Sequence, residues 1–125
     1  MPTHPREFEI NGVYHVIKRG VEKRSIFLKS QDYSRFILGI ELCNTVHSTD
    51  LWTLLVGADP AKVAERLQEK RTRNPEPLVD VLEFTLMPNH FHMSLREIRE
   101  GGISQYMQKM GGYSTYFNKQ YDRVG

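Results

Sequence analysis

The chain has 125 residues, of which 39% are hydrophobic and 26% are charged, so it fits one globular domain over residues 1–125 and leaves no room for a second. The net charge of +2 is too small to prove a nucleic-acid partner. Nothing near the N-terminus has the apolar run of a signal peptide, and no stretch approaches the roughly 20 apolar residues that span a bilayer, so we expect a soluble protein without a membrane partner.

The first elements are predicted as a strand and a helix. The segment from Gly12 to Gly20 is rich in β-branched and aromatic residues and predicts a strand that Gly20 ends. The stretch 30–32 then contains a Ser or Asp helix cap, and apolar residues follow at spacings of three and four, which indicates an amphipathic helix. These residues are Tyr33, Phe36, Ile37, Ile40 and Val46. The single Cys43 cannot form an internal disulfide and is expected to be buried, in a reducing, cytoplasmic setting.

The middle of the chain is less regular. The apolar run 51–56 is too short for its periodicity to separate a strand from a buried helical turn. Residues 59–73 open with Asp59 and Pro60, which suit a helix start, and then become very polar, so we expect 57–77 to be an exposed insertion between two core elements. Its run 70–73 could touch nucleic acid, but a solvated helix face is the better interpretation.

The last third predicts a hairpin and a bent helix. Two strand-like segments, 78–86 and 90–96, flank the turn sequence 87–89 and should pair antiparallel. After Gly101-Gly102, the helix is interrupted or bent at Gly111-Gly112. Its apolar side holds Ile103, Tyr106, Met107, Met110, Phe117 and Tyr121, and its other side Gln105, Lys109, Tyr116, Lys119 and Arg123. This order of elements fits an α+β, ferredoxin-like sandwich with helices packed on one face of an antiparallel sheet.

Two histidines lie two residues apart in the second hairpin strand. Side chains at i and i+2 of a strand share a face, so His90 and His92 could clamp a metal while Phe91 points into the core. Imidazole binds several divalent ions, and two ligands do not choose among them. From spacing alone, a surface residue and a turn-capping residue explain the pair equally well.

Several motifs in order resemble one family. Met87 to His92 matches the His-hydrophobic-His (HUH) signature of single-tyrosine transposases, especially the branch similar to REP-associated tyrosine transposases. The resemblance covers most of the chain outside roughly residues 51–77, and four ordered motifs are far more specific than two histidines. The other matching stretches are Tyr14-His15-Val16 with Arg19-Gly20, Ile26-Phe27 with Asp32-Tyr33, Gly101 to Lys109, and Tyr113 with 116–119.

The resemblance implies a reaction on DNA. In that family a divalent metal, usually Mg²⁺ or Mn²⁺, sits on the two histidines, here His90 and His92, and polarises a scissile phosphate of hairpin-containing single-stranded DNA. A tyrosine hydroxyl attacks, which leaves a 5′-phosphotyrosine and a free 3′-OH and keeps the bond energy for rejoining. The family also implies a homodimer in a prokaryotic cytoplasm, associated with the nucleoid.

The family's nucleophile is followed four residues on by Gln or Asn, which completes the metal site. Tyr116 and Gln120 fit this spacing, so they are the candidate nucleophile and third ligand. However, Tyr113 to Gly125 resembles the segment before the catalytic helix. By that alternative, which we favour, Tyr116 is an exposed or DNA-facing aromatic, the domain is C-terminally incomplete, and the nucleophile lies beyond Gly125. Tyr113 and Tyr121 are expected to be packing residues.

Basic residues concentrate toward both ends of the chain. Residues 1–35 carry seven Lys or Arg against four acids, residues 96–125 carry five against three, and the middle carries five against eight. If the ends meet, they form a basic face. Candidate DNA contacts are Lys18, Arg19, Lys23, Arg24, Lys109 and Lys119, with Arg19 the strongest. His15 is expected to be an ordinary sheet residue.

Three functions follow from these patterns. The first is an HUH single-tyrosine transposase that acts on hairpin-containing single-stranded DNA. The second is a noncatalytic DNA-binding remnant that recognises a hairpin and lacks the nucleophile. The third, a structural metal-binding protein unrelated to DNA, is supported only by the histidine pair.

Overall fold

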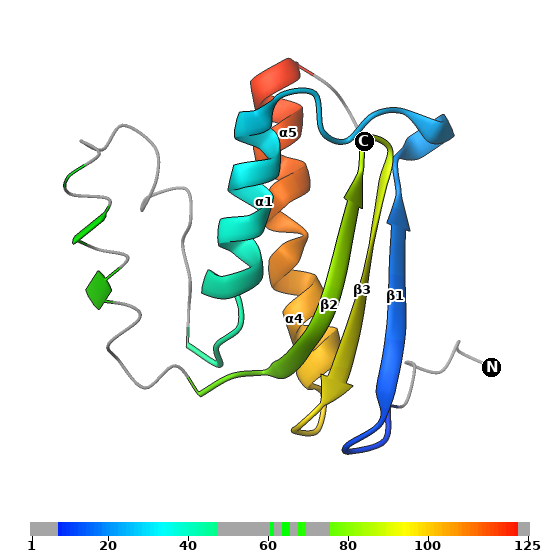
Figure 1. Ribbon diagram of the computed structural model, residues 1–125, viewed down its shortest axis with the longest axis vertical. Helices are drawn as coiled ribbons and strands as arrows, with labels where there is room; N and C mark the ends of the chain where they lie inside the picture. The colour runs from blue at the N-terminus through cyan, green and yellow to red at the C-terminus, as the bar shows by residue number, and fades with distance from the viewer. Residues whose placement is uncertain (1–7, 48–60, 62–63, 66–67, 70–75, 123–125) are drawn as a thin grey trace.

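The structure, a computed structural model, describes residues 8–47, 61, 64–65, 68–69 and 76–122 (Figure 1). Its strands form one antiparallel sheet in the order β1-β3-β2, and helices lie against one face of it (Figure 1). The elements in chain order are β1 (Val13–Arg19), the 3₁₀ helix η1 (Val21–Lys23), α1 (Ser30–Leu42), β2 (Val79–Met87), β3 (His90–Glu97), α4 (Gly102–Met110) and α5 (Gly112–Tyr121).

The arrangement confirms the α+β class with helices on one face of an antiparallel sheet. β3 lies between β1 and β2 and is antiparallel to both, so the chain passes from β1 through α1 to a second strand that runs the same way. This is the start of a ferredoxin-like order. The described residues contain three strands, and the complete ferredoxin-like sandwich stays a prediction.

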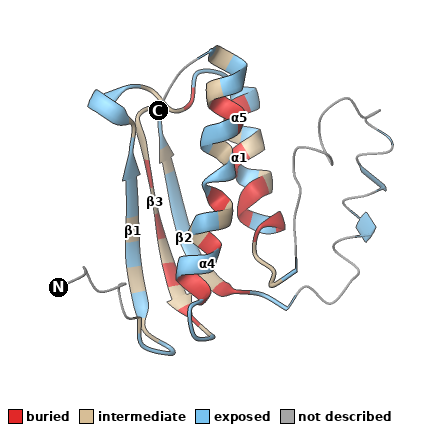
Figure 2. Cartoon of the chain, turned by 180° about the vertical axis from the view of Figure 1, so that it is seen from behind, coloured by how far each residue is buried: buried red, intermediate tan, exposed pale blue. Residues whose placement is uncertain are grey.

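The core lies between β3 and the helices. Phe91, Met93 and Leu95 alternate along β3 and are each at most 6% exposed, whereas their neighbours on the strand point the other way. The rings of Phe36 on α1 and Phe91 on β3 are 4.7 Å apart, so α1 covers the same face as α4. Figure 2 shows buried residues where the sheet and helices face each other. Cys43 is buried, as predicted.

Asn44 joins the end of α1 to the start of β2. Its side-chain oxygen accepts hydrogen bonds from the backbone N–H groups of Leu78 and Val79 at 2.9 and 3.0 Å, and its amide donates to the Val79 carbonyl at 2.9 Å. These three hydrogen bonds tie the end of α1 to the edge of the sheet. Residues 51–56 and most of the predicted insertion lie outside the described residues; 61, 64–65 and 68–69 are helical and exposed.

Most predicted elements are confirmed, including the hairpin turn and the break at Gly111. Three details were wrong. Val46, placed on the apolar side of the predicted helix, lies after α1, which ends at Leu42. The N-cap of α1 is Lys29, and Asp32 instead accepts backbone hydrogen bonds from inside the first turn. Ile37, placed on the apolar side of α1, is 46% exposed. No helix in the described part of the chain combines the length and apolarity needed to cross a membrane.

Candidate metal and nucleic-acid site

The helices leave one face of the sheet open, and the predicted histidines lie on it. His90, His92 and Ser94 alternate with the buried residues of β3 and are each partly exposed. The register places Arg19 of β1 opposite His90. The register also pairs Ser94 with His15 of β1 on one side and with Glu83 of β2 on the other. Cross-strand partners share a face, so we call these six residues the histidine face.

The turn before β3 is held by backbone hydrogen bonds. The Pro88 carbonyl accepts from the N–H groups of Ile26 and Phe27 at 2.7 and 3.2 Å. The Asn89 carbonyl accepts from the Gly20 N–H at 2.9 Å. The segment after β1 is therefore tied to the hairpin turn, which fixes the position of His90.

The imidazoles are arranged in a row. The ring centres of His90 and His92 are 6.1 Å apart and their planes differ by 14°. His92 Nδ1 lies 3.0 Å from His15 Nε2, and those ring centres are 5.0 Å apart. At the other end of the row, His90 Nδ1 lies 2.8 Å from Asn89 Oδ1. Each β3 histidine thus has its Nδ1 engaged by a neighbouring side chain.

A polar chain continues from His15. Ser94 Oγ lies 3.5 Å from His15 Nδ1, at the long end of the hydrogen-bond range, and donates to Glu83 Oε1 at 3.1 Å. Four side chains from three strands are consequently linked on one face. The sequence analysis missed His15 in this role, and Ser94 and Glu83 altogether, because only the pairing of β1, β3 and β2 brings them together.

The residues present fit a divalent ion in part. The Nε2 atoms of His90 and His92 have no hydrogen-bond partner among the described residues, and imidazole nitrogens bind divalent ions. In the same part of the chain, no group of three or more His, Cys, Asp or Glu side chains converges as a metal site. The predicted third ligand, Gln120, is exposed on α5 in the helix layer. The face therefore offers a two-ligand cradle.

Tyr116 is buried, at 7% exposure, so the prediction of an exposed or DNA-facing aromatic was wrong. Its hydroxyl donates to Asp32 Oδ1 at 3.1 Å, and the guanidinium of Arg35 lies 5.1 Å from its ring centre. The physical reason is that α5 packs against α1, where the buried Asp32 provides an acceptor for the hydroxyl. Tyr116 therefore lies across the sheet from the histidine face.

The electrostatics around Tyr116 also disfavour attack by its hydroxyl. Burial, and then the hydrogen bond to Asp32, raise the pKa of Tyr116, although Arg35 acts in the opposite direction. A raised pKa leaves less of the phenolate that a nucleophile requires. The other tyrosines are placed similarly: Tyr113 donates to the Ile26 carbonyl, and Tyr121 donates to Asp32 at 2.7 Å.

The predicted DNA-contacting cations are divided between the two faces. Arg19 is beside His90, and Lys18, one position earlier on β1, pairs with buried Phe91 and so turns toward the other face. η1 and its C-cap carry Lys23 and Arg24 next to β1, where both are exposed. α4 and α5 carry Lys109 and Lys119 in the helix layer (Figure 1).

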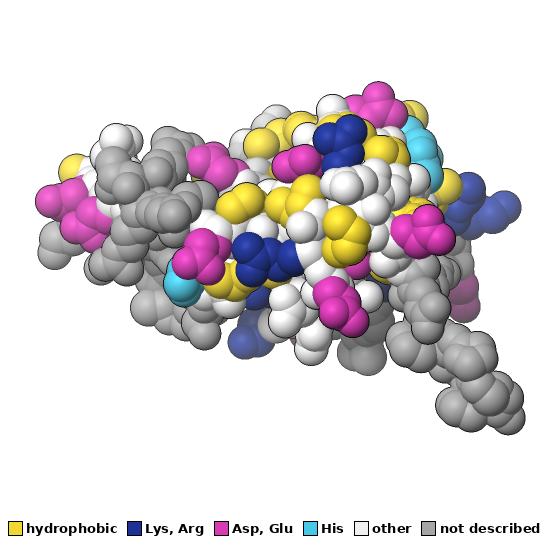
Figure 3. Space-filling model, turned by 90° about the horizontal axis from the view of Figure 1, so that it is seen from below, with side chains coloured by type: hydrophobic (Ala, Val, Ile, Leu, Met, Phe, Trp, Pro, Cys, Tyr) yellow, Lys and Arg dark blue, Asp and Glu magenta, His cyan; other side chains and the backbone are white. Residues whose placement is uncertain are grey.

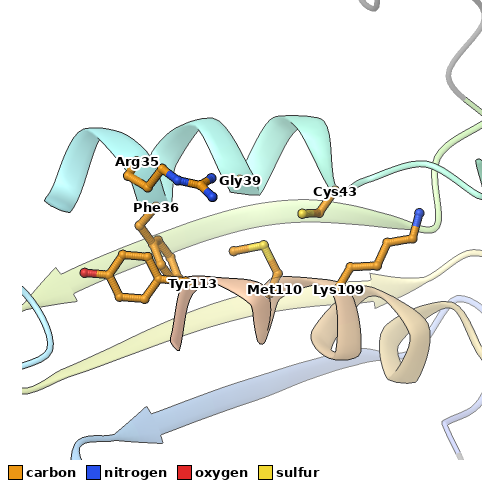
Figure 4. A pocket seen from close by; sticks show the side chains of 7 residues that line it. All are labelled: Arg35, Phe36, Gly39, Cys43, Lys109, Met110 and Tyr113. Atoms are coloured by element: carbon orange, nitrogen blue, oxygen red, sulfur yellow. The ribbon is translucent and has the colours of Figure 1, made fainter. Parts of the chain in front are cut away.

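Lys109 has a structural contact instead of a free surface position. Its ammonium group donates to the carbonyls of Thr45 and His47, just after α1. It also borders a small cleft between α1 and the last two helices (Figure 4). Cys43 and Met110 also line that cleft, which is therefore part of the helix packing and separate from the histidine face.

The basic face expected where the two ends of the chain meet stays a prediction. In Figure 3, which views the end of the molecule where β1 begins, acidic and basic side chains are interspersed among those drawn in colour. One ion pair there, Arg96 with Asp80 at 3.5 Å, joins β3 and β2. Among the candidate cations, Arg19 is the one that the strand register places opposite His90.

No family model, curated protein or solved structure matches the chain. Function is therefore inferred from the geometry of the histidine face and from the ordered motifs in the sequence.

Proposed function

We propose that this chain is a DNA transposase domain of the HUH single-tyrosine type, which binds hairpin-containing single-stranded DNA at the histidine face. The observation that carries the proposal is the placement of His90 and His92 side by side on an open sheet face, with Arg19 opposite His90. A metal ion bound there and the guanidinium of Arg19 would both be positive and next to an open surface, which suits the binding of a phosphate group. The resemblance of the surrounding motifs supplies the substrate class.

In this proposal His90 and His92 hold Mg²⁺ or Mn²⁺. The bound ion would supply positive charge that stabilises the negative charge developing on a scissile phosphate. Arg19 would bind a neighbouring phosphate and so position the strand along β1. The domain would work as a homodimer in a prokaryotic cytoplasm, at the nucleoid.

Cleavage and rejoining through a 5′-phosphotyrosine then require a tyrosine from outside the histidine face. The chain has six tyrosines. Tyr14 pairs with buried Leu95, which directs it to the helix-covered face, and the remaining five belong to the helices. We propose that the attacking hydroxyl belongs to a tyrosine beyond Gly125 or to a partner subunit.

The same placement of tyrosines favours a second candidate, a noncatalytic module that binds a DNA hairpin. Both candidates use the histidine face and the metal in the same way. They differ in whether the DNA strand is broken.

The test uses labelled single-stranded hairpin DNA with the intact protein, in Mn²⁺ or in a chelator. We expect salt-sensitive binding that weakens about tenfold or more in the chelator and in the double variant His90→Ala/His92→Ala. His47→Ala is the control, because His47 is exposed near the end of α1, and it should bind like the wild type. Binding that is indifferent to both the chelator and the double variant would exclude the proposed site.

Denaturing gels of the same reactions separate the two candidates. A covalent protein–DNA adduct supports the transposase, and intact DNA with retained binding supports the noncatalytic module. Because Tyr116 is buried against Asp32, Tyr116→Phe should leave binding unchanged. An adduct that Tyr116→Phe abolishes would overturn the placement of Tyr116 outside the site.

A further inference from the structure

We infer that His15, Ser94 and Glu83 form a hydrogen-bond relay that fixes His92 in the tautomer with its proton on Nδ1, leaving Nε2 bare for a metal. This inference rests on the proposed function only in its use of the metal at His90 and His92. The relay itself is a property of the metal-free protein.

The direction of the relay follows from counting protons, starting at Glu83. A carboxylate only accepts, and Ser94 Oγ lies 3.1 Å from Glu83 Oε1, so the one hydroxyl proton of Ser94 points to Glu83. Ser94 Oγ then has only lone pairs to offer His15 Nδ1, 3.5 Å away. Nδ1 of His15 must therefore carry a proton.

The same reasoning continues to the metal-facing histidine. A neutral imidazole carries one proton, so a proton on His15 Nδ1 leaves His15 Nε2 as an acceptor. His92 Nδ1 lies 3.0 Å from that atom and must be the donor. His92 Nε2 is consequently bare, which is the state that a metal ligand requires.

The ring geometry agrees with a hydrogen bond through the ring edges. The facing nitrogens of His15 and His92 are closer, at 3.0 Å, than the ring centres, at 5.0 Å, and the ring planes differ by 25°. The two nitrogens therefore lie between the ring centres, so the contact joins the ring edges. An N–H donor in the plane of its ring requires this arrangement.

His90 reaches the same state by a separate route. Its Nδ1 lies 2.8 Å from Asn89 Oδ1, and an amide oxygen only accepts. His90 is thus also protonated on Nδ1 with Nε2 bare. A ligating histidine usually donates its second N–H to such a partner, which fixes the ring and strengthens the metal bond. The relay makes His15 a positioning residue for His92.

The first test is the tautomeric state of the metal-free protein. Long-range ¹H–¹⁵N correlation spectra, recorded without DNA at about pH 8 where ordinary histidines are neutral, should show His90 and His92 protonated on Nδ1. In His15→Phe, His92 should lose this preference and His90 should keep it. His92 protonated on Nε2 in the wild type would overturn the relay.

The second test measures Mn²⁺ affinity by calorimetry, again without DNA. His15→Phe should weaken binding by about 10- to 100-fold, and Ser94→Ala and Glu83→Gln should weaken it by smaller factors. His15→Gln, which restores an acceptor, should recover part of the loss. Thr85→Ala is the matched control, because Thr85 is opposite His92 but outside the relay. Equal affinity in the wild type and His15→Phe would overturn the inference, and a failure to bind DNA would leave both tests intact.

Discussion

The carboxylate of Asp32 is fully buried and has four hydrogen-bond donors. The backbone N–H groups of Leu28 and Lys29 donate to it at 2.9 and 3.0 Å, and the hydroxyls of Tyr116 and Tyr121 complete the set. Burial by itself would raise the pKa of Asp32, but the hydrogen bonds outweigh burial and lower the pKa below its ordinary value. The negative charge also lies in the first turn of α1, where the helix dipole favours it.

Asp32→Asn should lower the free energy of unfolding at pH 7 by about 1–3 kcal/mol, because the amide cannot accept all four hydrogen bonds. The folded-state pKa of Asp32 is below the unfolded value of 3.8, so its contribution is complete above that pH and is lost as the pH falls through the folded-state pKa. Urea unfolding of both proteins between neutral and acidic pH should therefore show curves that converge in acid.

Asp80→Asn is the control for this measurement. The side chain of Asp80 is 47% exposed and its ion pair with Arg96 is 3.5 Å long, so its replacement should cost no more than about 0.5 kcal/mol. If the two variants lose the same stability at neutral pH, the hydrogen bonds to Asp32 do not have the effect assigned to them.

At the scale of elements, α4 and α5 each begin with a glycine, but the two have different surroundings. A Cβ on Gly102 would lie 2.1 Å from the Leu78 carbonyl oxygen, where β2 approaches α4. A Cβ on Gly112 would have no neighbour within 4 Å. Of these two positions, close packing excludes a side chain only at Gly102.

This contrast predicts opposite effects for two alanine variants. Gly102→Ala should lower stability by about 1–3 kcal/mol, because the backbone of β2 or α4 must shift. Gly112→Ala should raise stability by about 0.5–1 kcal/mol, because alanine loses less conformational entropy in a helix. Thermal unfolding should give a lower melting temperature for Gly102→Ala and a higher one for Gly112→Ala than for the wild type. A stabilising Gly102→Ala would contradict the close approach of α4 and β2.

Local sequence signals predicted the elements well because those signals act over a few residues. The turn at Pro88 and Asn89 and the break at Gly111 are examples. The contact between His15 and His92 could not be predicted in this way, because it joins residues 77 positions apart and depends on strand register. Tyr116 was assigned to the polar side from its spacing relative to the apolar residues of the helix. The buried acceptor on α1 decided its orientation.

At the scale of the whole molecule, the sheet separates two kinds of surface. The helix side contains the tyrosines that hydrogen-bond to Asp32, together with Lys109 and Lys119. The histidine face contains the relay and Arg19. Stability and DNA binding should consequently respond to different substitutions, although the sequence alone grouped cations from both sides as candidate DNA contacts.

Arg19→Gln and Lys119→Gln test this division, because each removes one positive charge from an exposed side chain on a different side of the sheet. If single-stranded DNA crosses the histidine face, Arg19→Gln should weaken binding and reduce the slope of log affinity against log salt by about 0.7, the value for one phosphate contact with a single strand. Lys119→Gln should leave the slope unchanged. Fluorescence anisotropy with hairpin DNA from about 50 to 200 mM salt provides the comparison. Equal losses in both variants would mean that binding follows net charge, and a loss in Lys119→Gln alone would move the DNA to the helix side, away from the histidines.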